Sequence, residues 1–245
     1  MVNVAMGFVV GGRHTDLIGN TIENFSRDGI ATGGHFNRFI RNRLYDSVKH
    51  GDGHHDYFFQ SHMGANPDLS SDVEITGNIF MNRYGVGQPA DTLGPTQCLS
   101  AFEDGPKTRI RITNNVCKGD HWHGITWYDT NDSVIVNNIA VGGSNFAGLP
   151  PGSSSWPNYS WISVDGAGNT IRNTITTRNL SGGDNNIEIQ PGEENLYFAD
   201  WLALDLEHAP GSPAIDAGNP DGAALYDIEG RPRDAQPDIG AYEAP

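Results

Sequence analysis

The chain has 245 residues, among them 31 glycines and 14 prolines, and it carries 30 acidic against 15 basic side chains. No stretch approaches the roughly 18 consecutive apolar residues that a membrane-spanning helix needs, so we expect no membrane span. The net charge of −15 would repel a phosphate backbone and no recognition motif accompanies the basic residues, so nucleic acid is not an expected partner. The first ten residues contain no basic leader, so no signal peptide is expected in this numbering.

One asparagine recurs along the chain between short β-branched segments. The six positions are Asn20, Asn42, Asn78, Asn115, Asn138 and Asn173, at intervals of 22, 36, 37, 23 and 35 residues. These intervals fit one period of about 22 residues with about a dozen residues inserted in three of the turns. A repeat this short, without helical periodicity, buries its apolar face only by stacking on its neighbours. The sequence therefore predicts an all-β solenoid in which the asparagines lie in register at one turn.

A further strand follows each asparagine turn, and four of these strands align. They begin at Asp28, Asp56, Gln97 and His123. Because neighbouring strands of a sheet lie about 4.8 Å apart, these four residues are expected to form one column. The turns beside this column are the richest in titratable residues. The turn residues concerned are Arg27, Lys49, Asp52, His54, His55 and His121.

This concentration of histidines and carboxylates predicts an active site for chemistry on a uronic acid. A base would remove the proton alpha to the sugar carboxylate, a cation would stabilise the enolate-like intermediate, and an acid would complete a lyase or an epimerase reaction. The candidate catalytic residues are Lys49, His54, His55, Asp56 and His123, with His54, His55 or His123 as the base. The candidate substrate-binding residues are Arg27, Asp28, Tyr57, His121, Trp122, Tyr128 and Trp156.

A metal site would use the same part of the chain. Asp28, Asp52 and Asp56, together with backbone carbonyls, could bind a hard cation such as calcium. His54, His55, His121 and His123 would instead suit zinc. Neither set has a diagnostic spacing, so no cofactor is required by the sequence and calcium is the candidate metal.

The two cysteines, Cys98 and Cys117, fall in different coils and in different parts of the repeat. Two cysteines cannot build a disulfide framework, and no metal-ligand spacing of the Cys-x-x-Cys kind is present. We therefore expect both to be small buried apolar side chains.

Charge is unevenly distributed. Residues 193–245 hold 12 acidic side chains but only two basic ones, Arg231 and Arg233. Residues 35–55 hold four basic side chains and four histidines, a local cationic strip that a polyanion could recognise. The inserted segments 60–72, 82–95 and 143–160 lie near several tryptophans and tyrosines, and flat aromatic rings commonly hold sugar faces. These features point to an acidic polysaccharide or oligosaccharide as the partner.

Several segments resemble a known superfamily. They are the asparagine turns, Asp28-Gly-Ile, residues 120–128 (Asp-His-Trp-His-Gly-Ile-Thr-Trp-Tyr) and residues 134–140 (Val-Ile-Val-Asn-Asn-Ile-Ala). They resemble the parallel β-helix proteins typified by pectate lyases, alginate lyases and mannuronan C5-epimerases, over about residues 7–180. Asp52-Gly-His54 is similar to the Asp-Pro-His motif of the epimerase branch, with glycine in place of proline. The resemblance implies a right-handed, single-stranded parallel β-helix.

The C-terminal segment carries a second resemblance. Residues 211–218 and 227–243 resemble the tail that ends many secreted bacterial β-helix proteins, which implies an extracellular or cell-surface location. We expect residues 1–191 to form the β-helix domain and residues 192–245 to form an irregular cap that is packed on it and covers its open end.

Two functional hypotheses remain open. The first is an enzyme that acts on an acidic polysaccharide, a lyase before an epimerase or a glycoside hydrolase. The second is a phage tailspike or cell-surface protein that binds polysaccharide with little or no catalysis, which would place it on a virion or a cell surface. The first hypothesis fits a monomer and the second a homotrimer.

Overall fold

The computed structural model describes residues 1–48, 56–61, 70–83, 96–102, 105–119, 121–142, 160–179 and 181–245. This part of the chain consists almost entirely of strands and irregular segments, with one short helix, α1 (Glu194–Tyr197). It contains no helix that is both long and apolar enough to cross a membrane.

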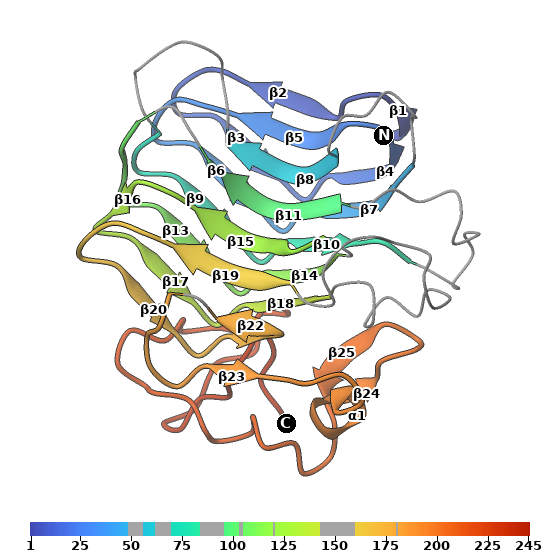
Figure 1. Cartoon of the computed structure of the whole chain (residues 1–245), viewed down its shortest axis with the longest axis vertical. Coiled ribbons are helices and arrows are strands. Elements are labelled where there is room, and N and C mark those ends of the chain that lie inside the picture. Colours follow the sequence, from blue (N-terminus) through green and yellow to red (C-terminus); the bar gives the residue numbers. More distant parts are fainter. Residues whose placement is uncertain are drawn as a thin grey trace.

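Most of the strands belong to three parallel sheets, which we call sheets A, B and C (Figure 1). Sheet A contains, in spatial order, β1 (Val2–Val4), β4 (Thr21–Phe25), β7 (Arg43–Ser47), β10 (Ile79–Met81), β14 (Val116–Gly119), β18 (Ile139–Gly142), β21 (Ile175–Thr176) and β23 (Ile187–Glu188). Sheet B contains β2 (Phe8–Val10), β5 (Asp28–Thr32), β8 (Asp56–Ser61), β11 (Thr96–Ala101), β15 (His123–Trp127), β19 (Trp161–Val164) and β22 (Arg178–Asn179). Sheet C contains β3 (Asp16–Ile18), β6 (Arg38–Ile40), β9 (Glu74–Thr76), β13 (Arg111–Thr113), β17 (Val134–Val136) and β20 (Thr170–Arg172).

The chain passes from sheet C to sheet A to sheet B and then begins the next coil, so each strand pairs with its counterpart one coil away. In sheet C, Asp16 is paired with Arg38, Arg38 with Glu74, and Glu74 with Arg111. The predicted all-β stack of parallel strands is confirmed, and the described residues form a parallel β solenoid. A two-stranded parallel sheet of β12 (Lys107–Thr108) and β16 (Thr130–Asn131) extends one of the turns.

The turn between sheets C and A explains the recurring asparagine. Asn42 Nδ2 donates to Leu17 O at 2.8 Å and to Asn78 Oδ1 at 3.0 Å, and Asn78 makes the same contacts with Phe39 O and Asn115 Oδ1. Each buried amide therefore satisfies a backbone carbonyl as well as its neighbour in the next coil. The residue before each asparagine has a positive φ, such as 67° at Gly19, and Gly or Asn adopts this conformation at low cost.

The predicted register is confirmed for Asn20, Asn42, Asn78, Asn115 and Asn138, but it is wrong for Asn173. Ile171 is paired with Ile135, so Asn173 aligns with Asn137, at the positive-φ position. The ladder position is filled by Thr174, whose Oγ1 accepts from the Asn138 backbone N–H at 3.4 Å. The ladder then returns to asparagine, because the Thr174 N–H donates to Asn186 Oδ1 at 3.0 Å. The interval from Asn138 to the next ladder residue, Thr174, is therefore 36 residues. The predicted ladder position, Asn173, was one residue too early.

The interior of the coils is a continuous apolar core. Phe58 packs edge to face on Phe25 with ring centroids 5.6 Å apart, and its ring is tilted against that of Phe80 with centroids 6.1 Å apart. The expectation of two separate buried cysteines is wrong in one respect, because Cys98 on β11 and Cys117 on β14 form a disulfide with a Cα–Cα distance of 6.1 Å. Both are buried in the core, and the bridge joins sheets B and A from the inside.

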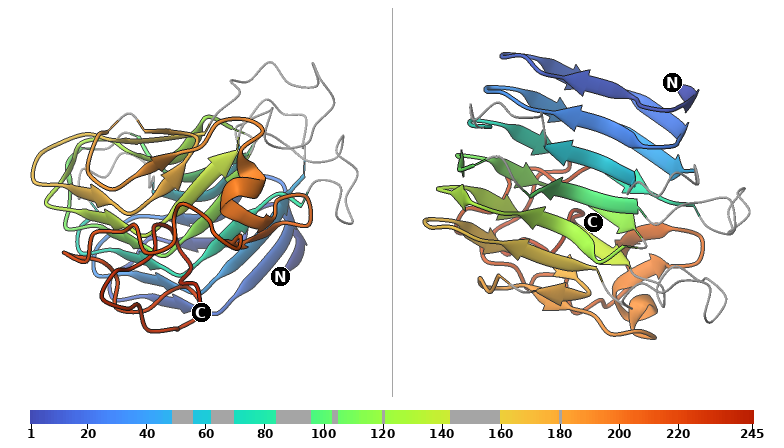
Figure 2. Two further views of the ribbon diagram at one scale, coloured as in Figure 1. Left: turned by 90° about the horizontal axis from the view of Figure 1, so that it is seen from below. Right: turned by 45° about the horizontal axis from the view of Figure 1, so that its top comes forward.

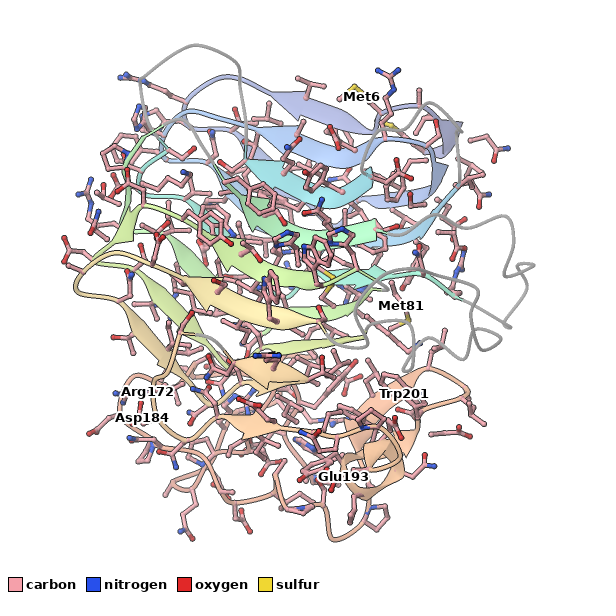
Figure 3. The ribbon with its side chains drawn as sticks, viewed as in Figure 1. Met6, Met81, Arg172, Asp184, Glu193 and Trp201 are labelled. Carbon is pink, nitrogen blue, oxygen red and sulfur yellow. A yellow bond between two sulfur atoms is a disulfide. The ribbon has the colours of Figure 1, made fainter. Side chains whose placement is uncertain are left out.

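The C-terminal segment continues beyond the coils as α1, the antiparallel pair β24 (Phe198–Asp200) and β25 (Asp205–His208), and a long irregular chain. It packs beside sheet A as well as beyond the last coil (Figure 2). Trp201 of this segment and Met81 of β10, both labelled in Figure 3, belong to one apolar cluster. The division into residues 1–191 and 192–245 stays a prediction.

Hydrogen bonds fix the C-terminal segment to the turns of the coils. Asn114 Nδ2 donates to Tyr226 O at 2.6 Å, and Asn137 Nδ2 donates to Asp238 O at 3.1 Å. Asn173 exchanges two bonds with Asn219 at 2.8 Å. Figure 3 also shows Arg172 beside Asp184, an ion pair of 3.1 Å near the last coils. The segment is thus attached along the side of the solenoid, at the positive-φ residues of successive coils.

Candidate functional site

The candidate site lies on the outer face of sheet B, where strand register aligns side chains from successive coils. Asp28 is paired with Tyr57 and Tyr57 with Gln97. His123 is paired with Trp161 and Trp161 with Arg178. The two runs are joined because Gln97 and His123 each lie two residues before the Leu99–Ile125 pair. We call these six residues the sheet B column. They are Asp28, Tyr57, Gln97, His123, Trp161 and Arg178.

Asp56 does not belong to the column, which corrects the predicted alignment. Asp56 is paired with Thr96, one residue earlier, so Tyr57 stands beside Asp28 instead. The Asp56 carboxylate is buried at the corner with sheet A, where Oδ2 accepts a 2.6 Å hydrogen bond from Ser47 Oγ. This environment suits a structural carboxylate, whereas the Tyr57 side chain is half-exposed on the face.

The middle of the column is a cluster of aromatic and imidazole rings. The His123 ring lies 5.1 Å from His121 in a stacked arrangement and 5.1 Å from Trp161 edge to face, measured between centroids. Trp122 stacks with Trp161 at 5.9 Å and an interplanar angle of 20°. His121 is buried, whereas Trp122, His123 and Trp161 are half-exposed. Rings from two coils therefore form one continuous surface.

Phe102 completes this cluster, although the sequence did not single it out. Its ring centroid lies 4.7 Å from His123, 5.7 Å from Tyr128 and 6.2 Å from Tyr57. Phe102 directly follows β11. Tyr57, His121, Trp122, His123 and Tyr128 are thus brought together as predicted candidates, with Phe102 and Trp161 added.

Polar groups hold these rings in place. Thr126 Oγ1 lies 3.1 Å from His123 Nδ1 and accepts a 3.2 Å hydrogen bond from Trp161 Nε1. The His123 backbone N–H donates to His121 Nδ1 at 3.2 Å. Thr126 is fully buried and neighbours Ser100 and Ser163 on the adjacent strands. The ring positions are therefore set by hydrogen bonds as well as by packing.

The upper end of the column carries Arg27, Asp28 and Tyr57. Burial raises the pKa of the Tyr57 phenol, and the nearby Asp28 charge raises it further, against an opposing hydrogen bond with Gln97. Tyr57 is therefore a protonated hydrogen-bond donor at neutral pH. The exposed Arg27 is adjacent, since its carbonyl accepts from the Tyr57 N–H at 3.1 Å.

Several predicted site residues lie outside the described residues. They are Lys49, Asp52, His54, His55 and Trp156. The described members of the predicted cationic strip do not form one patch. Arg38 on sheet C is paired with Asp16 at 2.8 Å, and Arg43 on sheet A donates to Gly77 O at 2.8 Å. In the described part of the chain, no three His, Cys, Asp or Glu side chains come together as a metal site, and Asp28 and Asp56 belong to different columns.

Comparison with models of known protein families found no match, and comparison with curated proteins found none either.

Proposed function

We propose that this protein acts on an acidic polysaccharide that it binds along the outer face of sheet B. The observation that carries this proposal is the continuous ring surface of Phe102, His123, Trp122 and Trp161, in register with polar residues on the coils above and below. Stacked rings offer apolar faces to sugar rings, and flanking donors select among sugars.

The dimensions of the face support a polymer. The column runs parallel to the solenoid axis through six coils, each about 4.8 Å from the next, so it offers about 24 Å of binding surface. The ligand would therefore lie across the strands, with successive sugar units meeting successive coils.

The charges on the column support recognition of carboxylates. Arg27 and Arg178 are exposed at its two ends, and the protonated Tyr57 and the imidazoles lie between them. The coils themselves are only mildly acidic, because residues 1–192 hold 18 acidic and 13 basic side chains. Most of the repulsion that an anionic ligand would meet comes from the C-terminal segment, beside sheet A.

For catalysis we propose β-elimination, with C5 epimerisation as the related alternative, in a right-handed solenoid of the pectate-lyase-like kind. Uronate chemistry needs a base, a group that stabilises the intermediate and a proton donor. Tyr57 would donate the proton to the leaving oxygen, and the described imidazoles would donate hydrogen bonds to the carboxylate. The base that accepts the sugar proton stays a prediction for His54 or His55, which lie outside the described residues. The disulfide between Cys98 and Cys117 supports an oxidising, extracellular location.

The test combines binding and turnover. Titration calorimetry with oligogalacturonate, oligomannuronate and sulfated glycosaminoglycan fragments should give saturable binding for at least one of them. Trp161→Ala should weaken that binding about tenfold or more, since a central aromatic dominates such surfaces. Tyr226→Ala, which removes an exposed ring of the C-terminal segment, serves as the matched control. Equal binding by both variants would contradict the proposed face.

A second candidate function is polysaccharide recognition without turnover. It is favoured by the site itself, because the Asp56 carboxylate is buried away from the face in a hydrogen bond with Ser47, and the His123 ring is held in a hydrogen bond with Thr126. Ultraviolet absorbance during incubation with each polymer detects unsaturated uronates from a lyase, and the ratio of uronate epimers detects an epimerase. Binding with neither product, by a trimer in gel filtration, would support the recognition protein on a cell surface or virion.

A further inference from the structure

We propose that Thr126 is a positioning residue that fixes neutral His123 with its proton on Nε2. His123 then donates a hydrogen bond to an anionic ligand oxygen and is not the base. The role toward the ligand rests on the proposed function, whereas the position of the proton does not.

The first step is the burial of the Thr126 hydroxyl. Thr126 lies on β15 with no exposed surface, between Ser100 on one neighbouring strand and Ser163 on the other. The Ser100 hydroxyl, itself buried, makes no hydrogen bond to a described residue. The Thr126 hydroxyl proton must therefore find its acceptor elsewhere, because an unpaired buried donor is costly.

The second step is the count of protons at Thr126 Oγ1. Trp161 Nε1 carries a hydrogen and can only donate, so Thr126 Oγ1 accepts in this 3.2 Å bond. The other hydrogen bond that Thr126 Oγ1 makes among the described residues joins it to His123 Nδ1 at 3.1 Å. The hydroxyl proton has this nitrogen as its acceptor, so Nδ1 is unprotonated and the ring hydrogen lies on Nε2.

The third step is the fixed orientation of the ring. His123 is packed edge to face against Phe102 at 4.7 Å and Trp161 at 5.1 Å. His121 stacks on it, and because His121 Nδ1 accepts the His123 backbone N–H, neutral His121 also carries its hydrogen on Nε2. Both imidazoles therefore present N–H groups from Nε2, in directions set by the surrounding rings.

The chemical consequence concerns the role of His123. An Nε2 that already carries a hydrogen cannot remove a proton from a sugar, but it can donate to a carboxylate oxygen without any transfer of the proton. The tautomer that could act as a base would leave the Thr126 hydroxyl without an acceptor. His123 is thus a neutral donor to the carboxylate, comparable to an oxyanion-hole group.

The decisive measurement is the imidazole tautomer by long-range ¹H–¹⁵N correlation NMR, with His123→Gln used to assign the signals. At a pH where the ring is neutral, wild-type protein should show a protonated Nε2 and an unprotonated Nδ1 at His123. Thr126→Ser keeps the hydroxyl and should keep this pattern, whereas Thr126→Val should give a mixture of tautomers. Thr113→Val, a buried threonine on sheet C, is the control. Protonated Nδ1 in the wild type or in Thr126→Ser would overturn the inference even if Thr126→Val failed to fold.

A second measurement tests the role toward the ligand. Thr126→Val should bind an oligouronate about tenfold more weakly than Thr126→Ser does, and both should bind the carboxyl-reduced oligosaccharide equally. Equal loss for both ligands would contradict donation to a carboxylate. If wild-type protein shows the expected tautomer but binds none of the oligosaccharides, the proposed function fails and the positioning by Thr126 stands.

Discussion

The outer faces of sheets A and B come from the same coils but differ in chemistry. On sheet A, one column of paired residues is polar in the first coils and apolar afterwards, in the order Thr21, Arg43, Ile79, Val116, Ile139, Ile175 and Ile187. On sheet B, the column carries charged, aromatic and imidazole groups. The C-terminal segment packs on the apolar part of sheet A, and none of its residues belongs to the sheet B column.

The difference lies in the outward-facing side chains of the strands, which give each face its own chemistry. The inward-facing side chains of both sheets stay apolar. On sheet A, Gly240 of the C-terminal segment lies so close to the sheet that a Cβ at this position would be 3.1 Å from Ile175 Cδ1. The segment therefore packs on the outer face of sheet A without a gap for a side chain at this point. On sheet B, the half-exposed rings of His123 and Trp161 are held by hydrogen bonds to the buried Thr126 hydroxyl, and no residue of the C-terminal segment belongs to this column. One face packs against the C-terminal segment, and the other is the face that we propose binds the polysaccharide.

The largest effect is expected where the C-terminal segment is fixed. Arg233 is almost fully buried and bonds to Glu243 at 2.8 Å, to Gly240 O at 2.7 Å and to Asn114 Oδ1 at 3.1 Å. Arg233→Met should lower the free energy of unfolding by about 3–5 kcal/mol, because it leaves a buried carboxylate uncompensated. Arg38→Met, at an exposed ion pair with Asp16, is the control and should cost about 1 kcal/mol or less. Denaturant midpoints that shift equally would contradict the assigned role of the segment.

A smaller effect is expected at the turn that both faces share. Asn115 is buried and bonds to Asn138 Oδ1 and to Ile75 O, so Asn115→Ala should cost about 1–3 kcal/mol. The same change at Asn20, which is half-exposed at the first coil, should cost less. Chemical denaturation measures both. An unchanged midpoint for Asn115→Ala would show that the ladder does not support the coils.

The smallest effect is a pH dependence that belongs to the C-terminal segment. Burial lowers the pKa of His208, although Asp238, 3.5 Å away, opposes the shift. His208 therefore binds a proton more readily in the unfolded chain than in the folded protein. Its neutral form contributes to the free energy of unfolding above about pH 6.5, and this contribution is lost as the pH falls below that value. Between about pH 7.5 and pH 5.5, wild-type protein should lose more stability than His208→Leu. Parallel pH profiles would contradict this assignment, since all other histidines are shared.

The sequence predicted the fold well because the turn depends on local chemistry. Gly19 and Asn20 show why, since a left-handed residue followed by a side chain that accepts a hydrogen bond recurs at this turn, and Gly and Asn suit these two positions best. The slip at Asn173 has the same origin, because asparagine suits both positions of the turn. Threonine can replace the ladder amide, so the motif itself did not distinguish Asn173 from Thr174.

The site was harder to predict because it depends on which residues of neighbouring sheet B strands are paired. The segments inserted between these strands differ in length, and the sequence does not fix the pairing across them to one residue. Choosing Asp56 instead of Tyr57 was an error of one residue, yet it put a buried corner carboxylate in the place of a half-exposed phenol. Phe102 follows a strand and gave no signal of its own. The position of the C-terminal segment did leave a signal, since the outward column of sheet A becomes apolar from Ile79 onward.

Coils of different length keep the same strand alignment, and this has a consequence for where the chain can accept inserted segments. Sheet C partners are separated by 22 residues between Asp16 and Arg38 but by 37 between Glu74 and Arg111, and both pairs hold the same alignment. The length of the connecting chain is therefore independent of the strand pairing. New segments can be inserted or exchanged between strands while the ladder and the core remain as they are. The architecture therefore lets a designer change the connecting segments without changing the pairing of the strands.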